Sequence, residues 1–243
     1  MISLLRKEIN SFLTSLIGYS VITILLLAIG LFLWVFPGNF NILDAGFASL
    51  ESLFVIAPWV FMFLIPAITM RSFAEEQRTG TIELLLTRPL SEWQIITAKY
   101  LAGLLLVIFS VLPTIVYYFS LKTLGNPFGN IDSGGTWGSY LGLIFLGGSF
   151  VSIGMFASSL TENQIVSFLI GFFLCFFFYA GFDSIASLEV FHPIEQLILK
   201  LGINEHFGSM SRGVIDTRDL VYFISFTLFF LALTRFRLLS RTW

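Results

Sequence analysis

The chain has 243 residues, of which 56% are hydrophobic and only 12% are charged. Soluble domains carry about twice that share of charged residues, so the composition predicts an integral membrane protein rather than a soluble domain. The formal net charge is −2 and the basic residues are spread along the chain, which excludes the basic patch of a nucleic-acid-binding protein.

The first 16 residues predict an amphipathic helix that lies in the membrane interface. Apolar side chains recur at helical spacing from Ile2 to Leu16, and polar side chains such as Lys7 and Asn10 lie opposite them. The apolar run that follows, residues 17–36, is long enough to cross a bilayer. No small-residue cleavage pattern closes this run, so we expect a retained transmembrane helix and not a signal peptide.

Five further apolar runs predict membrane spans. The expected fold is therefore an all-α integral membrane protein, in which residues 1–243 form one transmembrane domain with six spans. The last run is short because Arg235 and Arg237 interrupt it, and their side chains must extend toward the lipid headgroups. The further spans are residues 53–70, 100–121, 140–160, 165–182 and 220–236.

The basic residues predict the orientation of the chain. Six spans place both termini on one side of the membrane, and nine of the 13 Lys and Arg residues then fall on that side. The positive-inside rule therefore predicts cytoplasmic termini. The nine residues are Arg6, Lys7, Arg71, Arg78, Arg88, Lys99, Arg235, Arg237 and Arg241, and the other four are Lys122, Lys200, Arg212 and Arg218.

The first five apolar runs contain no Asp, Glu, Lys, Arg or His. They offer no candidate for a proton relay or an ion-coupling carboxylate, which disfavours a secondary transporter. Pro58, Pro66 and Pro113 interrupt predicted helices and can mark either gating kinks or prolines that packing tolerates. Small residues four apart predict close packing of the fourth span: Gly138 with Gly142, Gly148 with Ser152, and Gly154 with Ser158.

The charged stretch from Arg71 to Lys99 joins the second and third spans, so we expect a cytoplasmic loop. A helix that leaves the membrane at Arg71 would pair Glu75 with Arg71 and with Arg78. Gly80 suits the end of this helix because glycine accepts the left-handed conformation. The helix that enters the third span is predicted to begin with a capping box, Ser91 with Gln94, and a hydrophobic staple, Leu90 with Ile95.

A short helix is predicted inside this loop, from Thr81 to Thr87. Thr81 is the expected N-cap, Glu83 lies near the positive end of the helix dipole, and Pro89 stops the helix. A helix this short is not stable alone in water. Either a partner protein covers it or it dips into the headgroup layer, because its apolar residues surround it: Ile82, Leu84, Leu85 and Leu86.

This loop resembles the cytoplasmic segment of ABC-2 type transporter permeases, through the motif R-x-F-A-E-E-x-R-x-G-T-I-E-L-L-L-T-x-P-L-S followed by Lys99. The resemblance implies that the short helix is a coupling helix that docks on a cytoplasmic ABC ATPase, which binds the ATP and Mg. It also implies a bacterial inner membrane and a second permease half. The implied coupling residues are Thr81, Ile82, Glu83, Leu84, Leu85, Leu86, Arg88 and Pro89.

The connection between the fifth and sixth spans, residues 183–219, is long enough to form short extracytoplasmic helices at the membrane edge. His192 and His206 lack the neighbours of a metal site, and we expect His206 to be a polar cap or a surface residue. The motif E-H-F-x-S-x-S-R-G-V-I-D-x-R-D-L-V-Y-F resembles the segment before the last span in gliding-motility-associated ABC permease subunits and in permeases of nitrous-oxide reductase maturation. The first resemblance implies a link to gliding motility and an auxiliary membrane subunit with a large extracytoplasmic region.

Motifs of catalysis are missing from the sequence. There is no G-x-x-x-x-G-K-[ST] phosphate loop, no G-x-S-x-G elbow and no Ser-His-Asp or Cys-His set, so we expect neither an enzyme nor a bound cofactor. The single cysteine, Cys175, cannot form an intramolecular disulfide. Two alternatives stay open: a membrane scaffold of an envelope or motility machine that transports nothing, and an ABC-2 permease for another exported substrate.

Overall fold

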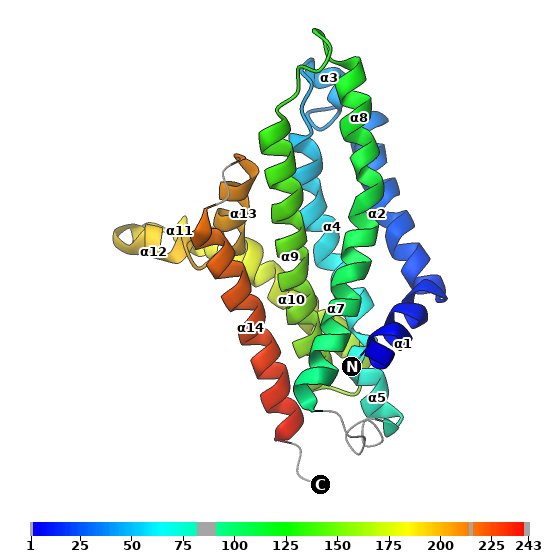
Figure 1. Cartoon of the computed structure of the whole chain (residues 1–243). Coiled ribbons are helices and arrows are strands. Elements are labelled where there is room, and N and C mark those ends of the chain that lie inside the picture. Colours follow the sequence, from blue (N-terminus) through cyan, green and yellow to red (C-terminus); the bar gives the residue numbers. More distant parts are fainter. Residues whose placement is uncertain (1, 82–90, 214–215, 241–243) are drawn as a thin grey trace.

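The structure of the chain is a computed structural model that describes residues 2–81, 91–213 and 216–240. These residues are mostly helical and include no strand, which confirms the expected all-α fold. Five helical stretches are long and apolar enough to cross a membrane, or six when α1 and α2 count as one bent span. The elongated bundle (Figure 1) contains α1 (Ile2–Leu13), α2 (Leu16–Trp34), α4 (Glu51–Thr69), α7 (Glu92–Val111), α9 (Ser133–Leu160), α10 (Gln164–Phe176) and α14 (Thr217–Leu239).

Helix α9 forms the centre of the bundle. In its most apolar stretch 78% of the helix is buried inside the protein, against 22% for the stretch that contains α10 and 28% for α14. A methyl group at Gly147 would lie 2.7 Å from Val107, and one at Gly148 would lie 2.8 Å from the Tyr100 hydroxyl. The close packing expected of this helix is therefore confirmed within the chain, where Gly142 faces Phe207 and Met210, and Gly154 faces Thr69.

The prolines have different effects in two helices. Pro58 and Pro66 lie inside α4, which continues through both of them. Pro113 lies where α7 gives way to the 3-10 segment η1 (Leu112–Thr114), which leads into α8 (Ile115–Leu124). A proline lacks the backbone N–H and crowds the preceding turn, so a local change of helix type is the expected response. Packing thus tolerates the first two prolines, and the third coincides with a change of helix type.

Helices α1 and α2 meet at an angle of 58°. Ser15 caps α2 by accepting the N–H of Gly18 at 3.2 Å. Lys7 and Asn10 are exposed on α1, whereas Leu4 is buried, so this helix has the amphipathic character expected from the sequence. Helix α1 packs against α7, and the polar residue Glu8 lies on the packed side together with Leu4.

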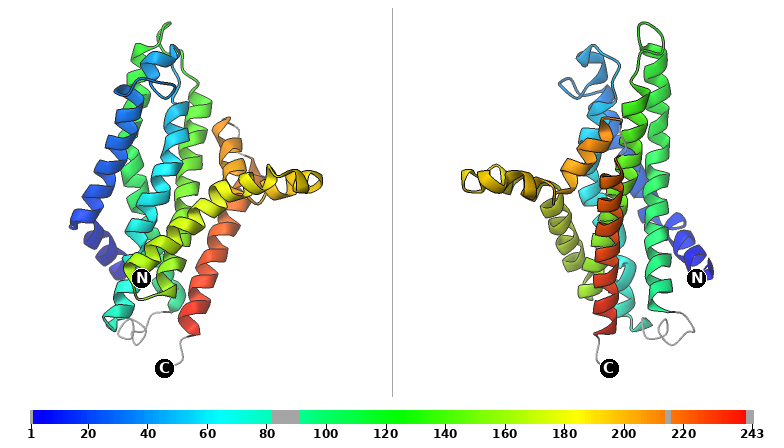
Figure 2. Two further views of the ribbon diagram at one scale, coloured as in Figure 1. Left: turned by 180° about the vertical axis from the view of Figure 1, so that it is seen from behind. Right: turned by 60° about the vertical axis from the view of Figure 1, so that its left-hand side comes forward.

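Different helices and turns lie at the two ends of the bundle. At one end α4 continues into the charged helix α5 (Arg71–Arg78), and α1 and the last turn of α14 lie at the same end (Figures 1 and 2). The other end carries α3 (Ile42–Ala45) and the turn between α8 and α9. The helices that begin and end the described chain therefore approach the same end of the bundle.

The connection between α10 and α14 consists of short helices. Helix α10 continues through the π-helical segment η2 (Phe177–Gly181), and the arm that follows projects sideways from the bundle (Figure 2). Helix α13 then returns to pack against α9 and α14. The short helices are α11 (Phe182–Ala186), the 3-10 segment η3 (Glu189–Ile194), α12 (Glu195–Leu199) and α13 (Ile203–Ser211).

Candidate coupling site between α5 and α7

Most of the coupling residues implied by the sequence fall outside the described part of the chain. Thr81 is described and exposed, and its hydroxyl lies 2.9 Å from the hydroxyl of Thr79. The remaining implied residues, Ile82, Glu83, Leu84, Leu85, Leu86, Arg88 and Pro89, lie outside the described residues, as does Leu90 of the expected hydrophobic staple. The candidate site is therefore built from the two helices that flank residues 82–90, α5 and α7.

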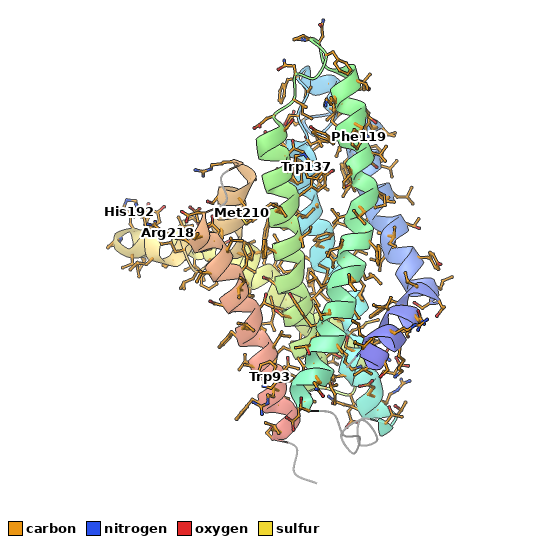
Figure 3. The ribbon with its side chains drawn as sticks, viewed as in Figure 1. Trp93, Phe119, Trp137, His192, Met210 and Arg218 are labelled. Atoms are coloured by element: carbon orange, nitrogen blue, oxygen red, sulfur yellow. The ribbon has the colours of Figure 1, made fainter. Side chains whose placement is uncertain are left out.

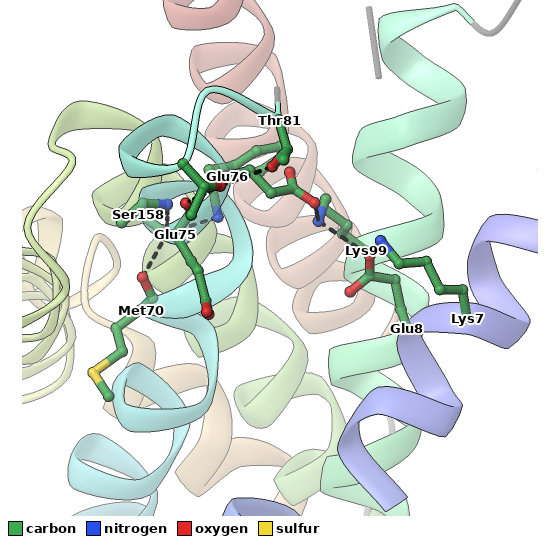
Figure 4. A network of polar contacts seen from close by, with 11 residues as sticks. Lys7, Glu8, Met70, Glu75, Glu76, Thr81, Lys99 and Ser158 are labelled. Atoms are coloured by element: carbon green, nitrogen blue, oxygen red, sulfur yellow. Dashed lines mark hydrogen bonds and ion pairs between the residues drawn. The ribbon is translucent and has the colours of Figure 1, made fainter. Parts of the chain in front are cut away.

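Helix α5 is fixed to the end of α9 at its junction with α4. The Ser158 hydroxyl accepts the backbone N–H groups of Phe73 and Ala74 at 3.0 Å each, and it donates to the Met70 carbonyl at 2.9 Å (Figure 4). The Gln77 side chain adds a bond to the carbonyl of the next α9 residue at 3.1 Å. One serine thus occupies the break between α4 and α5, where an inserted side chain is a known cause of helix bending.

Helix α5 ends as the sequence predicts. Gly80 follows the last turn with a φ of 69°, the left-handed conformation that glycine adopts without a side-chain clash. The expected ion pairs of Glu75 with Arg71 and Arg78 are wrong, because neither pair lies within 4.0 Å among the described contacts. Arg71 and Arg78 are exposed, and solvent leaves such surface pairs little energy to hold a geometry.

Helix α7 begins with the predicted capping box. The Ser91 hydroxyl accepts the Gln94 N–H at 3.3 Å, and the Gln94 side chain accepts the Ser91 N–H at 3.1 Å. Its first turn also contacts α14, because Glu92 lies 3.6 Å from the guanidinium of Arg235. That guanidinium covers the ring of Trp93, labelled in Figure 3, at 5.5 Å. The sequence led us to expect that Arg235 extends toward the lipid headgroups. In the structure its guanidinium also contacts α7.

A buried lysine joins the two flanking helices to α1. The Lys99 ammonium donates to Glu76 of α5 at 2.7 Å and to Glu8 of α1 at 3.2 Å (Figure 4). It also lies 5.3 Å from the ring of Phe73. Only 2% of the Lys99 side chain is exposed, against 13% for Glu8 and 14% for Glu76. Three helices that are far apart in the sequence therefore share one charged contact.

The charges in this cluster do not balance. Two carboxylates face one ammonium, and Lys7, which is largely exposed, lies 4.0 Å from Glu8. One oxygen of Glu76 is buried and has no hydrogen-bond partner. A charge taken out of water needs a close partner, so Lys99 holds both acidic side chains and hence α1 and α5. Sequence reasoning missed this cluster, and the only available signal was the lysine at the head of the third helix.

A cavity lies at the opposite end of the bundle, between the first turns of α4 and α9 and the helix α13. Its volume is about 610 Å³, which is in the range of small-molecule sites. Trp59 and Tyr179 line it together with the charged residues Glu51, Asp183 and Arg212. Among the residues that the structure describes, no group of three His, Cys, Asp or Glu side chains could hold a metal ion.

The chain matches a known protein family along most of its length. Residues 2–234 match the family model described as ABC-2 family transporter protein. A search of curated proteins gives no match. The matched range contains the charged stretch 71–99 and both helices that flank it, and proteins of this family are membrane transport subunits that are not themselves ATPases.

Proposed function

Because this chain belongs to the ABC-2 transporter family, we propose that it is the permease subunit of an ATP-driven complex in which residues 71–99 receive movement from an ATPase. Permeases of this family generally work with a cytoplasmic ABC ATPase. The chain is a multi-pass membrane protein, and we infer that it lies in a bacterial inner membrane with both termini in the cytoplasm.

One observation carries the proposal: both helices that flank residues 82–90 are fixed to other helices of the bundle. Ser158 ties α5 to the central helix α9, and Lys99 ties α7 to α5 and α1. A force on the loop would therefore move several helices as a unit and not bend one helix alone. Rigid-body movement of packed elements is the usual way in which a local event becomes a change of the whole transmembrane region.

The coupling residues themselves are part of the proposal. Thr81, Ile82, Glu83, Leu84, Leu85, Leu86, Arg88 and Pro89 would form the helix that docks on the ATPase. The apolar residues would fill the groove of the ATPase, and Glu83 and Arg88 would pair with charged residues around it, because interfaces combine an apolar centre with a polar rim.

The complex would contain further subunits. Six spans form half of an ABC pore, so we infer a second permease half, either another copy or a related chain. A role in gliding motility, with an auxiliary subunit that has a large extracytoplasmic region, is supported by the resemblance of residues 205–223 and by the agreement in chain length and six-span layout. ATP and Mg would be bound by the partner ATPase, since no phosphate loop occurs in this sequence.

The experiment is a pull-down of the tagged full-length protein from its native membranes in mild detergent. We expect a soluble P-loop ATPase among the recovered proteins, and we expect Leu85→Asp or Glu83→Lys to reduce its recovery. A loss of about ten-fold corresponds to about 1.4 kcal/mol of binding free energy. Lys122→Asp is the matched control, because it changes an exposed charge at the other end of the bundle.

Two results would contradict the proposal. Unchanged ATPase recovery in both loop variants would remove the coupling role of residues 81–89. Recovery of only envelope structural proteins with the unaltered chain, under conditions that preserve a known ABC complex, would favour the membrane scaffold instead.

A further inference from the structure

His206 lies between two hydrogen-bond acceptors at the end of the bundle opposite residues 71–99. Its Nδ1 is 2.7 Å from a carboxylate oxygen of Asp219, on α14, and its Nε2 is 3.0 Å from the backbone carbonyl of Lys200. The side chains of His206 and Asp219 are only 14% and 6% exposed. His206 is therefore not a surface residue. It caps the end of α12, as one of the two expectations from the sequence had it, because Lys200 is the C-cap residue of that helix, and it also joins α13 to α14.

The two acceptors around His206 determine how many of its ring nitrogens must carry a hydrogen. A neutral imidazole carries one N–H, so one ring nitrogen of His206 would direct a lone pair at an acceptor. The Lys200 carbonyl can only accept, and an ionised Asp219 carboxylate can only accept. Both contacts become hydrogen bonds when both ring nitrogens carry a hydrogen, which is the imidazolium form.

Two further contacts favour a positive charge on the ring. Tyr222 stacks on His206 with ring centroids 3.8 Å apart, and aromatic faces attract cations. The second carboxylate oxygen of Asp219 is buried without a hydrogen-bond partner. The negative charge of Asp219 therefore needs a close positive partner, and His206 is the one in contact with it.

We propose that His206 and Asp219 form a proton-binding site, which holds His206 as an imidazolium and fastens α13 to α14. The ligand is a proton from the compartment on the side of the membrane away from residues 71–99. The proton supplies the second donor that the two acceptors require.

Other titratable groups lie on the elements packed around this site. Glu205 is on α13 itself and is exposed. Among the described residues only Asp219 lies within ion-pair distance of His206. The groups on the elements packed around it are Lys200 after α12, Asp216, Arg218 and Tyr222 on or next to α14, Tyr179 in η2, and Tyr140 on α9.

The position of α13 gives the site a structural consequence. Phe207, Gly208 and Ser211 of α13 line the 610 Å³ cavity. The start of α13 is held separately, by a bond of 2.6 Å from Asn204 to Asp183. A neutral His206 could donate to only one of the two acceptors, so loss of the proton would release either Asp219 of α14 or the carbonyl of Lys200. Helix α13, which forms one wall of the cavity, would then be held by one contact fewer.

Nitrogen-15 NMR of the full-length protein in lipid nanodiscs tests the proposal, because the chain has only two histidines. His192 lies on the projecting arm (Figure 3), and its side chain is 83% exposed. It serves as the internal reference, and a His192→Gln variant assigns the two sets of signals. An imidazolium gives two protonated nitrogens, whereas a neutral ring gives one protonated and one bare nitrogen.

We expect His206 to keep two protonated nitrogens at a pH at which His192 has become neutral. A neutral pattern for His206 at that pH would overturn the proposal. In Asp219→Asn we expect His206 to lose one of its two N–H groups at the same pH, and an unchanged imidazolium would also overturn it. The spectrum of the unaltered protein is sufficient to determine whether His206 is an imidazolium. This result does not depend on whether Asp219→Asn folds.

Discussion

Lys99 and Glu76 form an ion pair of 2.7 Å that closes the loop between α5 and α7 at its base. Their positions are 23 residues apart, and the intervening chain includes all the residues proposed to meet the ATPase. The ion pair therefore holds the two ends of the loop together. Glu8 brings α1 into the same contact, so movement of the loop would reach the interfacial helix as well.

Replacing the lysine should destabilise the protein more than replacing one acidic partner. In Lys99→Met two partly buried carboxylates lose their ammonium, and removing one partner of a buried ion pair typically costs about 3–5 kcal/mol. In Glu76→Gln the amide oxygen can still accept from Lys99 and Glu8 still offsets the charge, so we expect about 1 kcal/mol, the size of one hydrogen bond. Thermal unfolding of the purified protein in detergent measures both variants.

The control for this prediction is Arg71→Met, which removes a basic residue from an exposed position on the same helix, α5. We expect its unfolding temperature to match that of the unaltered protein. If Lys99→Met were equally stable, the charged cluster would not hold the three helices together.

Ser158 offers a second test of the contact between α5 and α9. Ser158→Ala would leave two backbone N–H groups and the Met70 carbonyl without their partner, at about 1–3 kcal/mol for an unsatisfied buried group. The junction could relax by forming the ordinary helical bond from Ala74 to Met70, which would straighten α4 into α5. We therefore expect reduced ATP hydrolysis by the assembled complex as well as reduced thermal stability.

Ser152→Ala is the matched control for Ser158→Ala. It removes a hydroxyl from the same helix that is equally buried but donates only within α9, to the Ser149 carbonyl at 2.7 Å. ATP hydrolysis should be unaffected by this change. Equal losses of hydrolysis in both variants would mean that the serine at the junction has no special part in coupling.

Local features of the loop were predictable from the sequence, and contacts between distant residues were not. The capping box at Ser91 and the left-handed Gly80 depend on residues within a few positions of each other, so spacing alone specifies them. The contact between Glu8 and Lys99 joins residues 91 positions apart, and no spacing rule reaches that far. The sequence placed Lys99 at the head of a helix but gave no sign that it would be buried.

The same limit explains the wrong ion pairs of Glu75 and the contact of His206 with Asp219 that the sequence did not predict. Glu75 has basic residues at helical spacing, but these are exposed, and the acidic neighbour Glu76 is the one that faces the bundle. His206 has no recognisable pattern around it, because its partner Asp219 lies on the next helix and its second partner is a backbone carbonyl. The fold class followed from composition, since apolar runs of this length can only be satisfied as helices in a membrane.

Helix α9 supplies the last prediction, because it packs against its neighbours through glycines. A methyl group at Gly154 would collide with the side chain of Thr69 on α4, so we expect Gly154→Ala to destabilise the protein by about 1–3 kcal/mol, the usual range for overpacking. Gly208→Ala is the control, because the added methyl group on α13 would meet no atom within 4 Å apart from the backbone of its own helix and its two neighbours in the chain. This control should be neutral or stabilise by about 0.5–1 kcal/mol, since alanine favours a helix over glycine.

Thermal unfolding of the two alanine variants measures this difference directly. An unfolding temperature for Gly154→Ala at or above that of Gly208→Ala would show that α4 and α9 are not in close contact in the membrane. Because α4 continues into α5, the same result would also weaken the path from residues 71–99 to the central helix. A lower value for Gly154→Ala, with Gly208→Ala unchanged, would support tight packing of the two helices through which the loop is proposed to act.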